Sequence, residues 1–191
     1  MNTLLTRFKQ QLKKQFGQTI IFSKTESYDI YVSVKKENLL PFIFFLKNNT
    51  FTKFEILTDI VAYDCPNKIN RFRVIYNLLS VRYNCRLFVE VCTSEIEPLD
   101  SVCSLFPAAN WLEREVWDMY GVLFKNHPDL RRILTDYGFK GHPLRKDFPL
   151  TGFLEVNYDI NKKQLRQEPV ELALKFRDFK FDYKNNLINT N

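Results

Sequence analysis

Two stretches of alternating apolar and polar residues near the middle of this chain constrain its fold more than any other feature. In residues 72–78 and again in residues 87–91, apolar side chains occupy every second position. A period of two predicts β-strands with one face buried and the other facing water. A short polar reversal at residues 82–84 separates the two stretches. The sequence therefore predicts an antiparallel hairpin with one face that other elements must cover.

Further strands and helices are predicted on either side of this hairpin. Residues 54–63 alternate in the same way, which predicts a strand with Phe54, Ile56, Ile60 and Ala62 on the face turned toward the core. The other expected elements are strands at residues 19–23, 28–34 and 153–159, and helices at residues 38–48, 97–105 and 111–120. Together they predict an α+β fold, in which a mainly antiparallel sheet carries helices on one face and a long irregular C-terminal extension follows.

The domain organisation follows from where regular patterning ends. We expect residues 1–125 to form the α+β globular domain, and residues 126–191 to form an extended, partner-contacting segment and C-terminal tail. Beyond Gly152 the apolar residues are too interspersed with charge to build a second core. We therefore expect a partner to order this part of the chain.

Composition limits the class of protein without identifying it. The chain has 191 residues, of which 45% are hydrophobic, so it suits one globular domain plus an extension. Its net charge of +6 is compatible with nucleic acid, acidic lipid or an acidic protein as partner, and charge alone does not choose among them. No apolar run reaches the length of a membrane span.

The cysteines and histidines disfavour a metal centre. The chain has four cysteines without a CxxC pair and only two histidines to supplement them. This pattern argues against a zinc or iron–sulfur site. We expect free, buried or half-buried thiols, in a reducing compartment, at Cys65, Cys85, Cys92 and Cys103.

The N-terminal stretch has two interpretations. Residues 3–16 place leucines and phenylalanines on one side of a helix and basic residues on the other. A mitochondrial transit peptide has such a pattern, but this stretch lacks the expected serine richness and arginine bias. We favour an ordinary first helix that packs on the domain. A mitochondrial protein without a transit peptide would be synthesised inside the organelle.

The predicted helix at residues 111–120 is followed by a long segment that no regular element explains. Asn110 is placed to cap the helix, and Gly121 to end it in a left-handed conformation. After Gly121, prolines and glycines forbid a continuing helix up to residue 152. Basic residues alternate there with apolar ones, notably Arg131, Arg132, Arg145 and Lys146. An irregular segment of this length indicates function or an ordered partner, with a solvated loop as the alternative.

The charged residues of this region allow, but do not favour, catalysis or RNA binding. A metal or acid–base site could be drawn from Glu113, Glu115, Asp118, His127 and His142. Their spacing argues against it, because Arg114 lies four residues before Asp118 and is placed to pair with it. An RNA-recognition sheet would need a cluster of aromatic residues, and the hairpin strands carry arginines and aliphatic residues instead.

Glu113 stands apart from the other charges of the helix. By helical angle it projects between Trp117 and Tyr120, where an ionised carboxylate needs a cation or several donors. We expect an arginine of the following segment, Arg131, Arg132 or Arg145, to fold back onto it. The alternative is that Glu113 reaches water.

The helix and the segment after it resemble a known family. The matching residues are Glu113, Arg114, Glu115, Asp118, Met119, Tyr120, His127, Arg131, Ile133 and Leu134, followed by the run LTDYGFKGHPLRKDFPLTG. In order and spacing they are similar to the signature of the thirty-kilodalton subunit of respiratory complex I. Further along, the residues that resemble the family's C-terminal tail are Pro169, Val170, Phe176, Arg177 and Phe179, whereas residues 182–191 depart from it.

The resemblance implies a non-redox structural subunit in the peripheral arm of proton-pumping NADH:ubiquinone oxidoreductase, required for assembly. It implies a place on the matrix side of the mitochondrial inner membrane and a gene in the mitochondrial genome. The implied partners are the quinone-site subunit and adjacent iron–sulfur subunits, without nucleic acid or a membrane span.

The resemblance implies that the complex carries its FMN and iron–sulfur clusters on other subunits, so we expect no cofactor, metal or catalytic residue in this chain. The residues expected at interfaces or structural positions are Glu113, Arg114, Glu115, Asp118, Tyr120, Gly121, His127, Pro128, Arg131, Arg132, Gly141, His142, Arg145 and Asp147.

Overall fold

The predicted hairpin forms the centre of the fold in the computed structural model, which describes residues 16, 20–26 and 29–171. Strand β4 (Phe72–Ser80) pairs antiparallel with β5 (Cys85–Thr93), and Tyr76 lies opposite Val89. Alternate residues of both strands are buried, as the period of two predicts. The predicted antiparallel hairpin is confirmed.

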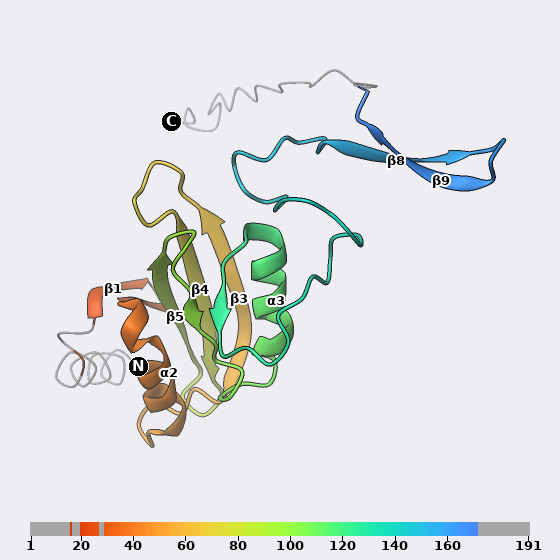
Figure 1. The fold of residues 1–191 in the computed structure, drawn as a ribbon. Helices are drawn as coiled ribbons and strands as arrows, with labels where there is room; N and C mark the ends of the chain where they lie inside the picture. The colour runs from red at the N-terminus through yellow and green to blue at the C-terminus, as the bar shows by residue number, and fades with distance from the viewer. Residues whose placement is uncertain (1–15, 17–19, 27–28, 172–191) are drawn as a thin grey trace, which may run out of the picture. The chain divides into compact units, whose positions relative to one another are not determined.

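Five strands make up the main sheet, in the order β1-β2-β5-β4-β3 (Figure 1). The other three strands are β1 (Ile20–Glu26), β2 (Asp29–Val34) and β3 (Ile56–Asp64). Three of the four strand pairs are antiparallel, which confirms a mainly antiparallel sheet. The exception is β2, which runs parallel to β5 because the chain crosses over through a helix and then returns along β3 and β4.

One face of this sheet is buried beneath two helices. Helix α2 (Leu39–Asn48) follows a short 3-10 turn, η1 (Lys36–Asn38), and buries Leu39, Phe42, Ile43 and Leu46. These residues join the inward residues of β4 and β5 in a single core, which also takes in Val116 of helix α3 (Ala109–Tyr120). Helix α3 lies along β3 (Figure 1). The expected arrangement of helices on one face is confirmed.

Strand β3 shifts its pattern through a bulge that the sequence did not reveal. Its register against β4 slips between Leu57 and Asp59, so two successive residues share one position. As a result Leu57 is buried, whereas Ile56 is 43% exposed. The prediction that Ile56 faces the core was wrong, and the predictions for Ile60 and Ala62 are confirmed.

Two predictions about the approach to α3 were also wrong. The expected helix at 97–105 is instead a short strand, β6 (Leu99–Asp100), which pairs in parallel with β7 (Phe124–Lys125) and is followed by tight turns. Asn110 does not cap α3, because the helix begins at Ala109, two residues earlier than predicted, and its cap residue, Ala108, has no side-chain acceptor to offer. Gly121 does end the helix, with a φ of 80°, as expected.

The chain separates into two compact units, Met1–Leu150 and Thr151–Asn191. The boundary predicted after residue 125 therefore lies inside the first unit. In the second unit the expected strand, β8 (Leu154–Asp159), pairs antiparallel with β9 (Gln164–Pro169), a strand that was not predicted. The predicted N-terminal helix, apart from Phe16, and the tail beyond Glu171 lie outside the described residues.

Across the part of the chain that the structure describes, no helix combines the length and apolar character needed to cross a bilayer.

Candidate functional site

The region singled out by the sequence is built around helix α3 and the irregular segment that follows it. On its sheet side α3 buries Ala109 and Val116, and it also buries three charged residues, Glu113, Arg114 and Asp118. Buried charges need partners. Those partners come from the irregular segment and from the turns before the helix.

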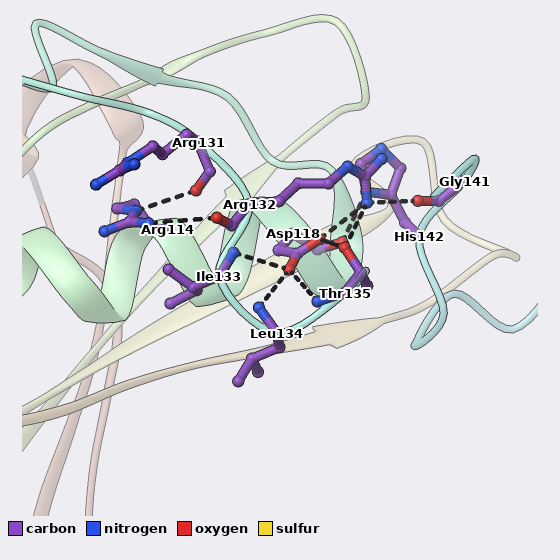
Figure 2. Close-up of polar contacts among 9 residues, drawn as sticks. All are labelled: Arg114, Asp118, Arg131, Arg132, Ile133, Leu134, Thr135, Gly141 and His142. Atoms are coloured by element: carbon purple, nitrogen blue, oxygen red, sulfur yellow. Dashed lines mark hydrogen bonds and ion pairs between the residues drawn. The ribbon is translucent and has the colours of Figure 1, made fainter. Parts of the chain in front are cut away.

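Asp118 is the hub of the contact between α3 and the irregular segment (Figure 2). Its side chain is fully buried. One carboxylate oxygen, Oδ1, accepts hydrogen bonds from the Arg132 guanidinium at 2.8 Å and from the Thr135 hydroxyl at 2.7 Å. The other, Oδ2, accepts from three successive amides, those of Ile133, Leu134 and Thr135, at 3.2, 2.9 and 2.9 Å. One side chain thus fixes the path of three residues.

These contacts keep Asp118 ionised. Burial by itself raises the pKa of the Asp118 carboxyl, but hydrogen bonds from the Thr135 hydroxyl and from the three amides outweigh it and hold that pKa at about 2. Arg132 extends the hub, since its Nη1 also donates to the Gly141 carbonyl at 3.0 Å. Its guanidinium stacks over the rings of Trp117 and Phe139 at 5.6 and 5.8 Å.

Arg114 reinforces the same segment by a route that the sequence did not predict. Its Nε and Nη2 donate to the backbone carbonyls of Arg131 and Arg132, at 3.0 and 3.3 Å (Figure 2). The expected pairing of Arg114 with Asp118 along the helix was wrong, because the segment supplies carbonyls to the arginine and a guanidinium to the aspartate. Arg114 and Asp118 therefore each bind the irregular segment and do not pair with each other.

The last turn of α3 is capped by the same segment. The final carbonyls of a helix have no partner within it. Here the carbonyl of Trp117 accepts from the Gly121 amide at 2.8 Å, and that of Met119 accepts from the Leu144 amide at 3.1 Å. The carbonyls of Asp118 and Tyr120 accept from His142 Nδ1 at 2.9 Å and from Arg145 Nε at 2.6 Å. All four terminal carbonyls are thus satisfied, and Arg145 adds positive charge at the negative end of the helix dipole.

The imidazole of His142 serves this cap in its neutral form. Burial lowers the pKa of His142, and the nearby charges of Arg145 and Arg132 lower it further, although the hydrogen bond to the Asp118 carbonyl opposes them. Because the carbonyl can only accept, Nδ1 carries the proton in this bond.

A second anchor ties the far end of the segment to the sheet. Asp64, at the end of β3, makes a bidentate ion pair with Arg71, both N–O distances being 2.7 Å, and its Oδ2 accepts from the Lys146 amide at 2.8 Å. The Arg71 hydrogen bonds lower the pKa of the Asp64 carboxyl. Arg71 also pairs with Asp147 at 3.0 Å. The segment is therefore held at both ends, by Asp118 near its start and by Asp64 and Arg71 near residue 146.

Glu113 is buried, but the expected arginine partner was wrong. Its carboxylate accepts from the Ser101 hydroxyl at 2.6 Å, from the Val102 amide at 2.8 Å and from the Cys103 thiol at 3.4 Å. The three candidate arginines are engaged elsewhere: Arg131 with Asp129, Arg132 with Asp118, and Arg145 with the Tyr120 carbonyl and Glu95. The alternative that Glu113 reaches water is also wrong, since its exposed fraction is zero.

His127 lies beside Glu113, and together with Cys103 they bring three potential metal ligands within 4.8 Å of one another. The hydrogen bonds of His127 determine its tautomer. The Asp129 amide donates to Nδ1 at 3.1 Å, so the neutral ring carries its proton on Nε2, which donates to the Asn110 carbonyl at 3.2 Å. The nitrogen that faces Glu113 is thus protonated, and the Glu113 carboxylate already has three donors. The three residues form a satisfied polar core.

The four cysteines do not fit an iron–sulfur cluster. All four are free thiols, as predicted. Cys85 begins β5 and Cys92 lies seven residues along it, about 23 Å away at the rise of a strand. One cluster needs its thiolates within a few ångströms of the same irons. Burial also raises the pKa of the Cys103 thiol, to about 11, so this group remains protonated.

The remaining predicted site residues lie at the surface. Glu115 and Pro128 are exposed, and the Arg131 side chain is 70% exposed beside Asp129. The residues that sequence reasoning missed are Asp64, Arg71, Ser101 and Thr135. Thr135 and Ser101 carried no pattern that could have indicated a role. Asp64 had a weak signal, because it follows directly on a predicted strand.

Gly121 offers a direct test of how tightly the segment closes on the helix. A Cβ atom there would approach the Arg145 guanidinium and lie 2.7 Å from the His142 ring. We expect Gly121→Ala to lower the free energy of unfolding by about 2 kcal/mol, about half of it from the positive φ. The measurement is a denaturant titration of the full chain.

Gly138→Ala is the matched control, because Gly138 also has a positive φ, of 73°, but no atom within 4 Å of the added Cβ. The difference between the two variants isolates the cost of displacing Arg145 and His142. Equal losses of unfolding free energy in the two variants would show that Arg145 and His142 move aside at no energetic cost.

The fold and the hub define a protein in which buried charges of one helix hold a long irregular segment in a fixed path. Residues 32–154 match the sequence model of the family described as the 30-kDa subunit of respiratory-chain NADH dehydrogenase. This match covers more than half of the chain, and the chain belongs to this family.

Individual relatives agree with this assignment. The chain is 51% identical over 183 residues to NADH-ubiquinone oxidoreductase subunit 9 of Reclinomonas americana, covering 94% of this chain and 88% of that protein. It is 56% identical over 143 residues to NADH dehydrogenase [ubiquinone] iron-sulfur protein 3 of Beta vulgaris, covering 75% and 74%. Among solved structures, a trypsin-resistant fragment of Nqo5 is similar with a TM-score of 0.56 and 30% identity, covering 65% of this chain and 99% of the fragment.

Proposed function

We propose that this chain is a non-redox structural subunit in the peripheral arm of NADH:ubiquinone oxidoreductase, and that it positions the quinone-site subunit and adjacent iron–sulfur subunits. The observation that carries the proposal is the Asp118 hub. Its buried carboxylate binds the chain's own irregular segment, from Arg132 to Thr135. A buried carboxylate with these contacts holds the irregular segment in one conformation, and so fixes the shape of the surface that the segment presents to other subunits.

The cysteines support a subunit without a redox centre of its own. Because Cys85 and Cys92 are separated along one strand, the thiols cannot converge on one cluster. In this proposal the FMN and iron–sulfur clusters of the complex lie on other subunits, and electron transfer to ubiquinone occurs there. This chain contributes by fixing distances between those subunits, and the complex requires it for assembly.

The location proposed for the chain is the matrix side of the mitochondrial inner membrane, as part of a membrane-bound, proton-translocating complex. The mitochondrial genome is the proposed site of its gene. Arg131 is the best placed of the charged signature residues to contact a partner, since it is exposed and its pairing with Asp129 lies at the surface. The second unit, from Thr151 onward, is proposed to be ordered by that partner.

The experiment replaces Arg132 with alanine and measures two quantities separately. We expect the amount of assembled complex, quantified on native gels, to fall at least threefold, because the segment loses its ion pair to Asp118. The NADH:ubiquinone turnover per assembled complex should stay close to that of the wild type. Arg82→Ala, an exposed arginine in the turn between β4 and β5, is the control and should change neither quantity.

The opposite pattern would contradict the proposal. Normal assembly with lost turnover would place Arg132 in the chemistry of electron or proton transfer. Stoichiometric iron or flavin bound to the purified chain would equally contradict a non-redox subunit.

A further inference from the structure

A tight turn within the irregular segment presents a single aromatic side chain to the outside. In residues 136–139 the Phe139 amide donates to the Asp136 carbonyl at 3.2 Å, and Gly138 has a φ of 73° at the third position. This is the geometry of a type II turn. Tyr137 occupies the second position, and its amide donates to Asp136 Oδ1 at 2.8 Å. The Tyr137 side chain is almost fully solvated, with 98% of the residue exposed.

The turn is fixed on both sides. Immediately before it, Thr135 is bound to Asp118 through both its amide and its hydroxyl, at 2.9 and 2.7 Å. At the last position of the turn, the Phe139 ring packs against Phe148 at 5.9 Å and beneath the Arg132 guanidinium. The hub shown in Figure 2 therefore holds the base of the turn on helix α3. Because the backbone of the turn is already held in one conformation, Tyr137 loses little conformational entropy when it binds a partner.

We propose that Tyr137 is an anchor that inserts into a pocket on a neighbouring protein subunit. The pocket has apolar walls for the ring and a hydrogen-bond acceptor for the phenol. This inference rests on the proposed function, in which the chain docks to other subunits. Tyrosine is enriched among the few residues that carry most of the binding free energy of protein interfaces, because it offers a large ring and a polar tip.

The surrounding charges favour a protein partner over RNA or lipid. Binding of phosphates would need free cations beside the aromatic ring. Arg132 and Arg145 are instead committed to Asp118 and to the Tyr120 carbonyl. Lys140 is the exposed basic residue closest in sequence to the turn. This single cation is fewer than a phosphate backbone or an anionic lipid surface requires, and on a protein partner it calls for one carboxylate at the rim of the pocket. The partner is therefore a folded subunit with an apolar pocket and an acidic rim.

The test is a competition for assembly between full-length chains. Wild-type chain, isotopically labelled, and an unlabelled variant are supplied together to cells lacking the native chain, and their ratio in the purified complex is measured by mass spectrometry. We expect Tyr137→Ala to be incorporated about 30-fold less well than wild type. Tyr137→Phe, which keeps the ring and loses the hydroxyl, should be about 5-fold less well incorporated.

Ile69→Ala is the matched control, since Ile69 is also 98% exposed and lies in the loop between β3 and β4. It should compete equally with wild type. The unfolding midpoints of all three variants should match that of the wild type, because none of the altered side chains is buried.

Three outcomes would overturn the anchor. One is equal incorporation of Tyr137→Ala and wild type, and another is an equal loss for Tyr137→Ala and Ile69→Ala. The third is unchanged incorporation together with weakened binding to RNA or to anionic phospholipid vesicles. In each case the wild-type chain still enters the complex, so the proposed function survives. Failure of the wild-type chain itself to enter the complex would instead contradict the proposed function.

Discussion

Replacing Asp118 with asparagine should lower the free energy of unfolding by about 3 kcal/mol, because an amide would face the Arg132 guanidinium, donor against donor, and leave that cation without its partner. Removing one partner of a fully buried pair costs roughly 3–5 kcal/mol, and Arg132 keeps 25% of its side chain exposed, which places the effect at the lower end. The three amides from Ile133 to Thr135 keep one oxygen acceptor.

The measurement is a urea titration of the full chain beside Glu115→Gln, which makes the same chemical change at an exposed position of the same helix. Glu115→Gln should shift the free energy of unfolding by less than about 0.5 kcal/mol. A double-mutant cycle with Arg132→Met should then show a coupling energy of about 2 kcal/mol. Additive effects of the two substitutions would mean that the ion pair contributes nothing.

The same carboxylate predicts how stability depends on acidity. The pKa of Asp118 is about 2 in the folded protein, below its ordinary value of 3.8. Its contribution is therefore complete above the unfolded pKa and is lost as the pH falls through the folded one, amounting to about 2 kcal/mol. Wild type should lose this stability between about pH 4 and pH 2, and Asp118→Asn should not.

Features of this fold that depend on local sequence patterns could be predicted, whereas features that depend on distant parts of the chain could not. The hairpin of β4 and β5 could be predicted because the alternation of apolar residues and a short reversal are both local. The parallel pairing of β2 with β5 could not, since it depends on a crossover through α2 and a return along β3 and β4. The bulge at Leu57 could not be predicted, because one extra residue leaves the composition of the strand unchanged.

The candidate site divides in the same way. The resemblance singled out Asp118, Arg132 and His142 as interface or structural residues but did not pair them with one another. Three of the five donors to Asp118 are backbone amides, which no side-chain pattern indicates. The Glu113 partners were missed for a related reason. Ser101 directly follows β6 and Cys103 lies in a turn, whereas the sequence predicts a helix over 97–105 that would have pointed both side chains elsewhere.

An arginine partner for Glu113 would make Glu113→Gln strongly destabilising, whereas the contacts observed in the structure predict a small effect for glutamine and a large one for alanine. Glu113→Ala should lower the free energy of unfolding by about 3 kcal/mol, because the Ser101 hydroxyl and the Val102 amide lose a buried acceptor and a cavity replaces the side chain. Glu113→Gln should cost only about 1 kcal/mol. It keeps the shape and one oxygen, the Ser101 hydroxyl can turn to accept, and no cation is stranded.

The pH dependence of the Glu113→Gln deficit tests this account directly. Burial raises the pKa of Glu113, and the hydrogen bonds from Ser101, Val102 and Cys103 offset this only in part. The folded protein therefore binds the proton more tightly than the unfolded chain, so this group's stabilisation is present below the unfolded pKa and is lost as the pH rises through the folded one. Glutamine does not titrate, and the stability gap between wild type and Glu113→Gln should shrink between about pH 4 and pH 7. Urea titrations of both proteins across that range measure the gap. A gap that widens with pH would mean that a cation holds the carboxylate ionised, and the polar core described here would be wrong.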